Sequence, residues 1–333
     1  MSDRYRVVEE DFGGHPILVL SDEVAKQTAR VLPSVGNNCV SYKLTVEDRD
    51  VELFHAAPDA ETLLGRPSGY GIPILFPWPN RIDRGRFSFE GTDIHLETPE
   101  PNAHLLHGFV LNRAWQVEAT GVDDGAWMTG RFRSSEDEGI VRQWPFPFET
   151  VCTYRLREGR LSVEFEGTNT GSSNMPCGLG FHPYFGLPLE AGGDRGACRI
   201  QLPAASYWPL REDNIPTGVI LFVNEDYDLR ELSALGDRYY DDVWTDVAVS
   251  ADGWSRCLFE DPHSGVKIEV EADGGFREWV FYAPDNRPVV CFEPYTCTTD
   301  AFNLATRGIE GGMSVLGPGE SLTGVMSFEP NRV

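Results

Sequence analysis

The sequence lacks any cluster of cysteines. Its seven cysteines stand singly between Cys39 and Cys297, and no two have the CxxC spacing. Disulfide frameworks are typical of short secreted chains with an even number of cysteines, and structural zinc sites use closely spaced pairs. An odd, scattered set in a chain of 333 residues therefore argues against both.

The sequence also lacks long apolar runs. No apolar segment is long enough for a membrane-spanning helix. Six of the first eleven residues are charged, whereas a secretory signal needs an apolar stretch there. These absences predict a cytoplasmic protein that does not interact with membranes.

Basic residues are scarce. The chain has 28 lysines and arginines against 52 aspartates and glutamates, so its formal net charge at pH 7 is −24. Such a surface repels phosphate backbones and anionic lipids, which makes nucleic acids and membrane surfaces poor partners. The acidity favours solubility, but it does not determine the charge of any single pocket.

Helical signals are few. Only residues 24–29 and 229–235 have patterns from which we expect a turn or two of helix. Short segments in which apolar and polar residues alternate recur instead, as in 86–89, 161–166 and 266–271. With 34 glycines and 23 prolines, this pattern is typical of half-buried antiparallel strands joined by frequent turns. The sequence predicts an all-β protein with few short helices, either a β-sandwich or a closed barrel.

The domain organisation is expected to be simple. No Gly/Ser-rich linker, repeat or low-complexity tract divides the chain. Because β-sandwiches often exceed ordinary domain size, we interpret residues 1–333 as one domain. Its N-terminal stretch, residues 1–20, is expected to be loosely packed.

Polar side chains concentrate in five loop-like segments, where functional residues tend to gather. The first contains three prolines, which bar a central strand and predict a rigid extended segment that presents Asn80 and Arg81. The segments are 71–81, 104–109, 180–185, 239–244 and 291–296.

Two of these segments share an ionisable residue that is followed by proline and tyrosine. The residue before a proline is extended, so His182 and Glu293 are expected on straight backbone. Aromatic residues flank both, and aromatic faces beside a few directed polar groups suit a pyranose ring. The flanking aromatic residues are Phe181, Tyr184, Phe185, Phe292 and Tyr295.

These segments, in this order, resemble the aldose 1-epimerases (galactose mutarotases) within the wider galactose-mutarotase-like superfamily. The resemblance covers roughly residues 20–330 and implies a large antiparallel β-sandwich whose open groove binds a hexose. The motifs that carry it are GIPILFPWPNRIDRGRFSFEG at 71–91, HGF at 107–109, WPFPFE at 144–149, GLGFHPYF at 178–185, DDVW at 241–244, EPYTCTTDAFNL at 293–304 and LGPGE at 316–320.

The resemblance also implies roles for individual residues. Glu293 would be the general base and His182 the general acid. Sugar hydroxyls would be bound by His107, Arg81 and Asp241, with Asn80 beside them. The family places an aspartate three residues before an aromatic residue, which selects Asp241 before Trp244 and leaves Asp242 as the lesser candidate.

The chemistry of anomer exchange agrees with this pair. The C1 hydroxyl must lose a proton while the ring oxygen gains one, and a glutamate carboxylate beside an imidazole supplies both transfers. We expect the carboxylate to be ionised and to raise the pKa of the imidazole. No cofactor and no metal are required. The sequence leaves the choice of aldose and the oligomeric state open.

Two other functions fit the same motifs. A hexose-6-phosphate 1-epimerase would need arginines near the sugar phosphate, for which Arg113 and Arg84 are candidates. A non-catalytic sugar-binding or sensing module would use the same fold without turnover.

Individual motif residues also have structural interpretations. His104 and His107 lie three residues apart, a spacing that suggests a zinc site, although no other segment supplies further ligands. Arg81 could instead anchor its loop by pairing with Asp83 or Glu90. Asp241 could instead cap a turn.

Overall fold

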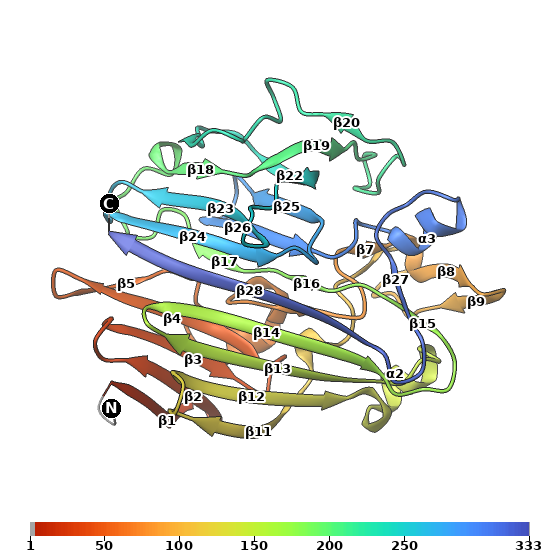
Figure 1. The fold of residues 1–333 in the computed structure, drawn as a ribbon, viewed down its shortest axis with the longest axis horizontal. Coiled ribbons are helices and arrows are strands. Elements are labelled where there is room, and N and C mark those ends of the chain that lie inside the picture. Colours follow the sequence, from red (N-terminus) through yellow and green to blue (C-terminus); the bar gives the residue numbers. More distant parts are fainter. Residues whose placement is uncertain (1–3, 333) are drawn as a thin grey trace.

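The computed structural model describes residues 4–332, and these residues form mostly antiparallel β-strands. The nine-stranded sheet forms one layer, and an eight-stranded and a five-stranded sheet lie behind it (Figure 1). The prediction of an all-β sandwich with few short helices is confirmed. The described residues contain three α-helices of six residues each: α1 (Ala60–Gly65), α2 (Glu138–Gln143) and α3 (Ala301–Thr306).

The nine-stranded sheet is built around long hairpins. Along β13, buried and half-buried residues alternate, as expected for a sheet with one face in the core. The predicted strands at 161–166 and 266–271 lie in β14 and β24. The strand order is β11 (Gln116–Gly121), β12 (Ala126–Arg133), β13 (Phe148–Arg157), β14 (Arg160–Asn169), β28 (Ser321–Arg332), β24 (Val266–Asp273), β23 (Trp254–Asp261), β18 (Arg199–Gln201) and β21 (Ser233–Ala234).

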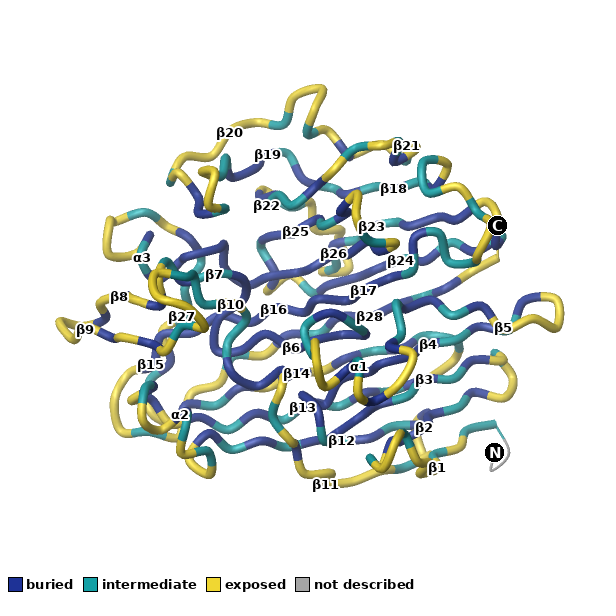
Figure 2. The backbone as a smooth tube through the Cα atoms, turned by 180° about the vertical axis from the view of Figure 1, so that it is seen from behind, coloured by how far each residue is buried: buried dark blue, intermediate teal, exposed yellow. Residues whose placement is uncertain are grey.

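The eight-stranded sheet differs because its central strand β26 is buried at every position. One face of β26 packs on the core, and the other is covered by loops that surround the cavity described below. Figure 2 shows this central region in dark blue. The order is β20 (Leu221–Phe222), β19 (Ala204–Trp208), β22 (Tyr240–Val247), β25 (Glu278–Ala283), β26 (Val289–Tyr295), β16 (Gly180–Phe181) and β6 (Ile74–Leu75), and β17 (Tyr184–Gly186) also pairs with β26.

The remaining strands form one five-stranded sheet and three short pairs. The five-stranded sheet runs in chain order as β1 (Tyr5–Phe12), β2 (His15–Asp22), β3 (Gln27–Leu32), β4 (Asn38–Val46) and β5 (Arg49–Glu52). The pairs are β7 (Arg81–Ile82) with β10 (Leu105–Leu106), β8 (Arg86–Phe89) with β9 (Thr92–His95), and β15 (Met175–Cys177) with β27 (Ser314–Leu316).

Two local predictions are wrong, and a third holds only in part. Within the N-terminal stretch, β1 has no buried residue, whereas β2 carries buried residues such as Leu20 into the core; residues 1–3 lie outside the described part. The expected helical turns are absent because residues 24–26 form a turn into β3, and residues 229–235 include the short strand β21. In each case, pairing with a neighbouring strand overrides a weak local helical preference.

Aromatic side chains connect the layers. Phe328 of β28 contacts Phe54 and Phe185, with ring centroids 5.2 and 5.8 Å apart. The Trp279 indole of β25 donates a hydrogen bond of 2.9 Å to the Ser255 hydroxyl of β23, which joins the eight-stranded sheet to the nine-stranded one. Burial of each such side chain contributes roughly 1.5–3 kcal/mol. The core therefore holds the cavity-forming sheet rigidly in place.

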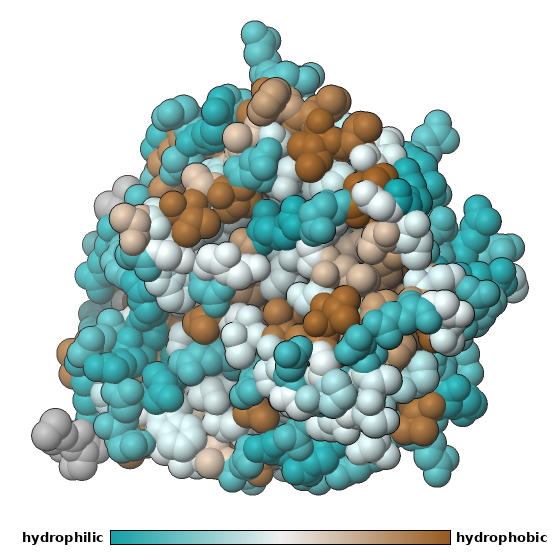
Figure 3. All heavy atoms as spheres, turned by 45° about the vertical axis from the view of Figure 1, so that its right-hand side comes forward, coloured by the Kyte–Doolittle hydropathy of each residue, from teal (hydrophilic) through white to brown (hydrophobic). Residues whose placement is uncertain are grey.

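The surface is mostly polar. The face drawn in Figure 3 is largely hydrophilic, with hydrophobic patches that are separated from one another. Within residues 4–332, no helix is both long enough and apolar enough to cross a membrane.

Candidate active site

A cavity of about 370 Å³ opens on the covered face of the eight-stranded sheet. This volume lies within the range of small-molecule binding sites. All six residues selected from the sequence as catalytic or sugar-binding line it. The lining residues are Arg66, Ser68, Asn80, Arg81, Leu106, His107, His182, Tyr184, Tyr239, Asp241, Val280, Tyr282 and Glu293.

Strand register sets the floor of the cavity. Asp241 of β22 lies opposite Tyr282 of β25, and Val280 of β25 lies opposite Glu293 of β26. Because side chains alternate along a strand, these four point to the same face of the sheet. Asp242 points to the other face and does not line the cavity. The sheet thus brings together residues that are more than 50 positions apart in the sequence.

Two loops that form one wall are held in unusual backbone conformations. Asn80 and His107 have φ angles of 52° and 68°, in the left-handed region. The His107 amide donates a 2.8 Å hydrogen bond to the Asn80 carbonyl. Left-handed backbone at non-glycine residues costs of order 1–3 kcal/mol and is concentrated at functional sites. Gly108 follows His107 because a Cβ there would overlap the Phe76 carbonyl.

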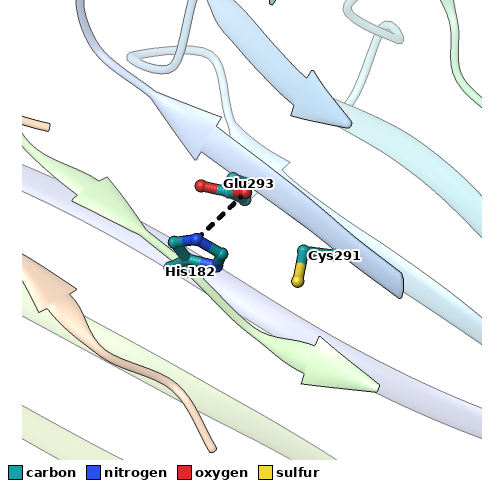
Figure 4. A group of neighbouring side chains, drawn as sticks. All are labelled: His182, Cys291 and Glu293. Atoms are coloured by element: carbon teal, nitrogen blue, oxygen red, sulfur yellow. Dashed lines mark ion pairs between the residues drawn. The ribbon is translucent and has the colours of Figure 1, made fainter. Parts of the chain in front are cut away.

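The proposed acid and base are in direct contact. His182 Nε2 lies 3.3 Å from Glu293 Oε1, and Figure 4 shows Glu293 pointing from its strand toward the imidazole. The Tyr184 hydroxyl lies 3.2 Å from the same His182 nitrogen. The Tyr295 hydroxyl donates a hydrogen bond to Glu293 Oε2. Each member of the pair is therefore oriented by a tyrosine two residues further along the chain.

Packing explains the position of Tyr295. Its ring lies over Gly180, where a Cβ would come within 2.5 Å of Tyr295 Cδ1. Gly180 and Tyr295 are paired residues of β16 and β26. A glycine at position 180 thus permits the close approach that places the tyrosine hydroxyl on the Glu293 carboxyl.

Burial dominates the electrostatics of the pair. Glu293 and His182 are 2% and 6% exposed. Burial raises the pKa of Glu293 well above its ordinary value; the hydrogen bond from Tyr295 opposes this shift. Burial also lowers the pKa of His182 well below its ordinary value, and the neighbouring His107 adds to this shift. The expectation that the glutamate raises the histidine pKa is therefore wrong, because loss of water outweighs the attraction between the two groups.

Arg81 and Asp241 form an ion pair inside the cavity. Arg81 Nη2 lies 3.7 Å from Asp241 Oδ2, and Arg81 Nη1 donates a 2.6 Å hydrogen bond to the Asn80 side chain. Burial raises the pKa of Asp241, and the charge of Arg81 opposes this shift. The alternative in which Arg81 anchors its loop through an acidic residue at position 83 or 90 is wrong. Asp241 lies within β22 rather than at a turn, so the capping alternative is wrong as well.

His107 remains neutral at the edge of the acid–base pair. Its ring packs edge to face against His182, with centroids 5.4 Å apart. Burial lowers the pKa of His107 to about 3, and Arg81 adds to the effect. The Nδ1 atoms of His107 and His182 are buried and have no protein hydrogen-bond partner. A neutral imidazole can both donate and accept hydrogen bonds, as sugar hydroxyls do.

The aromatic surface of the cavity differs from the prediction. Phe181, Phe185 and Phe292 are fully buried and belong to the core, so they cannot stack on a sugar. Of the predicted aromatic residues Tyr184 does line the cavity, and Tyr239 and Tyr282 line it as well. Tyr282 was missed because its strand EWVFYA shows no polar alternation in the sequence. Tertiary structure alone distinguishes the two faces of such a strand.

A possible metal-ligand set overlaps the same pair. The ligand atoms of His182, Cys291 and Glu293 lie within 4.8 Å of one another (Figure 4). Burial raises the pKa of the Cys291 thiol, and nearby Glu293 adds to this shift. A cation would therefore have to displace protons from buried donors. His104 does not belong to this set, because its ring contacts Asp83 and Asp213 at 3.2 and 3.6 Å.

The two arginines considered for a sugar phosphate lie outside the cavity. Arg113 Nε donates a 2.6 Å hydrogen bond to the Asp137 carboxylate and lines a separate depression. Arg84 is exposed and lies 3.6 Å from Asp83. Neither residue lines the cavity that contains Glu293.

Known proteins resemble this chain along most of its length. The family model for aldose 1-epimerase matches residues 20–329. YphB of Escherichia coli, an uncharacterized protein, is 26% identical over 303 residues, which cover 86% of this chain and 95% of YphB. Human galactose mutarotase is 30% identical over 210 residues, which cover 61% of this chain and 58% of that protein.

The fold is similar to that of solved structures. A galactose mutarotase-like protein from Clostridium acetobutylicum has a TM-score of 0.90 at 23% identity, and the match covers 100% of both chains. The fold and the cavity thus place the protein in the galactose-mutarotase-like class. The chain belongs to the aldose 1-epimerase family.

Proposed function

We propose that this protein is a cofactor-independent aldose 1-epimerase that interconverts the α and β anomers of a free aldohexose. The observation that carries the proposal is the 3.3 Å contact between His182 and Glu293 in one sugar-sized cavity. Acid and base must act on neighbouring atoms, the C1 hydroxyl and the ring oxygen, and two side chains in contact can reach both.

The reaction opens and recloses the ring. Glu293 accepts the proton of the C1 hydroxyl, and the C1–O5 bond breaks with its electron pair on O5. His182 donates a proton to O5, which leaves the open-chain aldehyde. Rotation about the C1–C2 bond exposes the other carbonyl face, and reclosure returns both protons to their donors.

The pair needs one proton in total for this cycle. Burial favours a protonated Glu293 and a neutral His182. The direct contact provides a path for that proton from the carboxyl to Nε2, which produces the reactive arrangement without a change in net charge. Because both pKa shifts favour neutral groups, the singly protonated pair should persist over a wide pH range.

The other cavity residues would bind the sugar. Arg81, Asp241 and Asn80 offer a set of charged and amide groups for hydroxyls, and His107 offers a neutral ring near O5. Tyr239 and Tyr282 offer apolar ring surface for the CH groups of the pyranose, whereas the Tyr184 ring stacks on His182. We further propose that residues 1–333 act as one unit in the cytoplasm; all seven cysteines are free, in keeping with a reducing compartment.

The test is direct. The optical rotation of freshly dissolved α-D-glucose or α-D-galactose is followed with and without protein. Faster approach to the equilibrium rotation supports the proposal. If several aldoses reach equilibrium at the same rate with and without protein, the proposal is contradicted. Sugar binding without acceleration would identify a non-catalytic sugar-binding module instead.

A further inference from the structure

Two arginines beside the cavity lack the carboxylate partners that most arginines of this acidic chain have. Arg66 lines the cavity, and Arg287 lies behind it against Tyr184. Within residues 4–332, no carboxylate oxygen lies within 4.0 Å of either guanidinium group. By contrast, Arg81 in the same cavity is paired with Asp241. The Arg66 side of the cavity therefore carries uncompensated positive charge.

The short turn η1 (Pro67–Gly69) holds these groups together. The aliphatic arm of Arg66 lies along Gly69, where a Cβ would come within 3.0 Å of its Cγ and Nε atoms. Arg287 Nη2 donates a 2.9 Å hydrogen bond to the Gly69 carbonyl. Ser68, between them in the turn, also lines the cavity. Arg287 thus fixes a turn that presents a guanidinium group and a hydroxyl to the same cavity.

The other contacts of Arg287 supply no negative charge either. Its guanidinium carbon lies 5.3 Å from the Tyr184 ring centroid, and its Nη1 atom is buried without a hydrogen-bond partner. The pKa of nearby His55 is lowered by burial and by the charges of Arg287 and Arg66. His55 therefore stays neutral and adds no further charge. Two permanent charges with no counter-ion create a positive potential at this end of the cavity.

We infer that Arg66 and Ser68, with Arg287 in support, bind an anionic group of the substrate. This inference rests on the proposed function, and it names the substrate class as aldoses with a negatively charged substituent away from C1. A guanidinium group and a hydroxyl provide the N–H and O–H donors that a carboxylate, phosphate or sulfate group accepts. Because Glu293 and His182 occupy the C1–O5 side, the anion would be carried at another carbon, such as C6.

The first experiment compares anomerisation rates of three probes: D-glucose, D-glucuronate and D-glucose 6-phosphate. We expect kcat/KM for at least one charged sugar to exceed that for glucose about tenfold or more, since charge-assisted hydrogen bonds contribute that much. The Arg66→Ala variant should reduce this preference by a similar factor. The two charged probes distinguish a carboxylate from a phosphate subsite.

Arg86→Ala is the matched control. Arg86 is also exposed and without a carboxylate partner, but it lies outside the cavity. The Arg86→Ala variant should leave the ratio of kcat/KM for charged sugars to kcat/KM for glucose unchanged. If wild-type protein shows no preference for either charged sugar, or if Arg66→Ala affects all three sugars equally, the anionic subsite is refuted.

A binding measurement separates this inference from the catalytic proposal. Calorimetry with the Glu293→Gln variant measures the affinity for the same three sugars without turnover. Tighter binding of a charged sugar that depends on Arg66, in a protein that accelerates no anomerisation, would retain the subsite and refute the catalytic function. If the protein instead accelerates the anomerisation of glucose and both charged sugars equally and binds all three with equal affinity, the catalytic function is retained and the anionic subsite is refuted.

Discussion

Replacement of Glu293 by glutamine should change activity and stability in opposite directions. Glutamine keeps the shape of the side chain and can still accept the hydrogen bond from Tyr295, but it cannot accept a proton from the C1 hydroxyl. General base catalysis contributes about 10²–10⁴ in rate, so we expect kcat to fall a hundredfold or more. The His182→Asn variant should lose a similar factor.

The gain in stability follows from the burial of the carboxyl. The unfolded chain ionises near pH 4.5, whereas the folded protein keeps Glu293 protonated to a much higher pH. A raised folded pKa gives stability that is complete below the unfolded pKa and is lost as pH rises toward the folded one. At pH 7 this loss is at most about 3.4 kcal/mol, from 1.36 kcal/mol for each of the 2.5 pH units between 4.5 and 7.

Glutamine does not titrate and avoids this loss. For a chain of 333 residues, the corresponding increase in Tm is at most about 5 °C at pH 7 and is close to zero at pH 4.5. Differential scanning calorimetry at both pH values measures it, and polarimetry measures the rate.

Glu278→Gln is the matched control. Glu278 is a buried glutamate on the neighbouring strand β25, burial raises its pKa to about 8, and it does not line the cavity. We expect it to share the pH-dependent stabilisation while leaving the rate unchanged. A Glu293→Gln variant with full activity would refute the catalytic assignment. If Glu293→Gln has a lower Tm than wild type at pH 7, the argument that the buried carboxyl loses stability as the pH rises is refuted.

Other predictions concern the same cavity. Because burial lowers the His182 pKa and raises the Glu293 pKa, kcat/KM should be flat across the ordinary histidine value of 6.5; a steep inflection there in a pH–rate profile would contradict the shared-proton scheme. Tyr295→Phe should lower kcat about ten- to a hundredfold and move the basic limb of that profile to higher pH, since its hydrogen bond lowers the Glu293 pKa. Arg81→Ala and Asp241→Ala should mainly raise KM in initial-rate measurements, and an effect confined to kcat would argue against a binding role.

Local sequence patterns are enough to predict the fold class and to select His182 and Glu293 as candidates for acid–base chemistry. Period-two alternation in segments such as 161–166 predicts half-buried strands because the side chains of a strand alternate between two environments. The HPY and EPY segments indicate His182 and Glu293, because proline restricts the preceding residue to extended backbone and aromatic residues flank both. These signals are local, so a sequence carries them completely. The roles of His182 and Glu293 as acid and base come from the family resemblance.

Only the tertiary structure decided which groups meet and how they are charged. Strand register brings Asp241 to the cavity floor and turns Asp242 away from it. The pairing of Arg81 with Asp241, the tyrosine lining and the uncompensated charge of Arg66 depend on contacts between distant segments. The protonation of the proposed acid–base pair was mispredicted for the same reason: exclusion of water from a buried site is a property of the whole fold, and no local pattern records it.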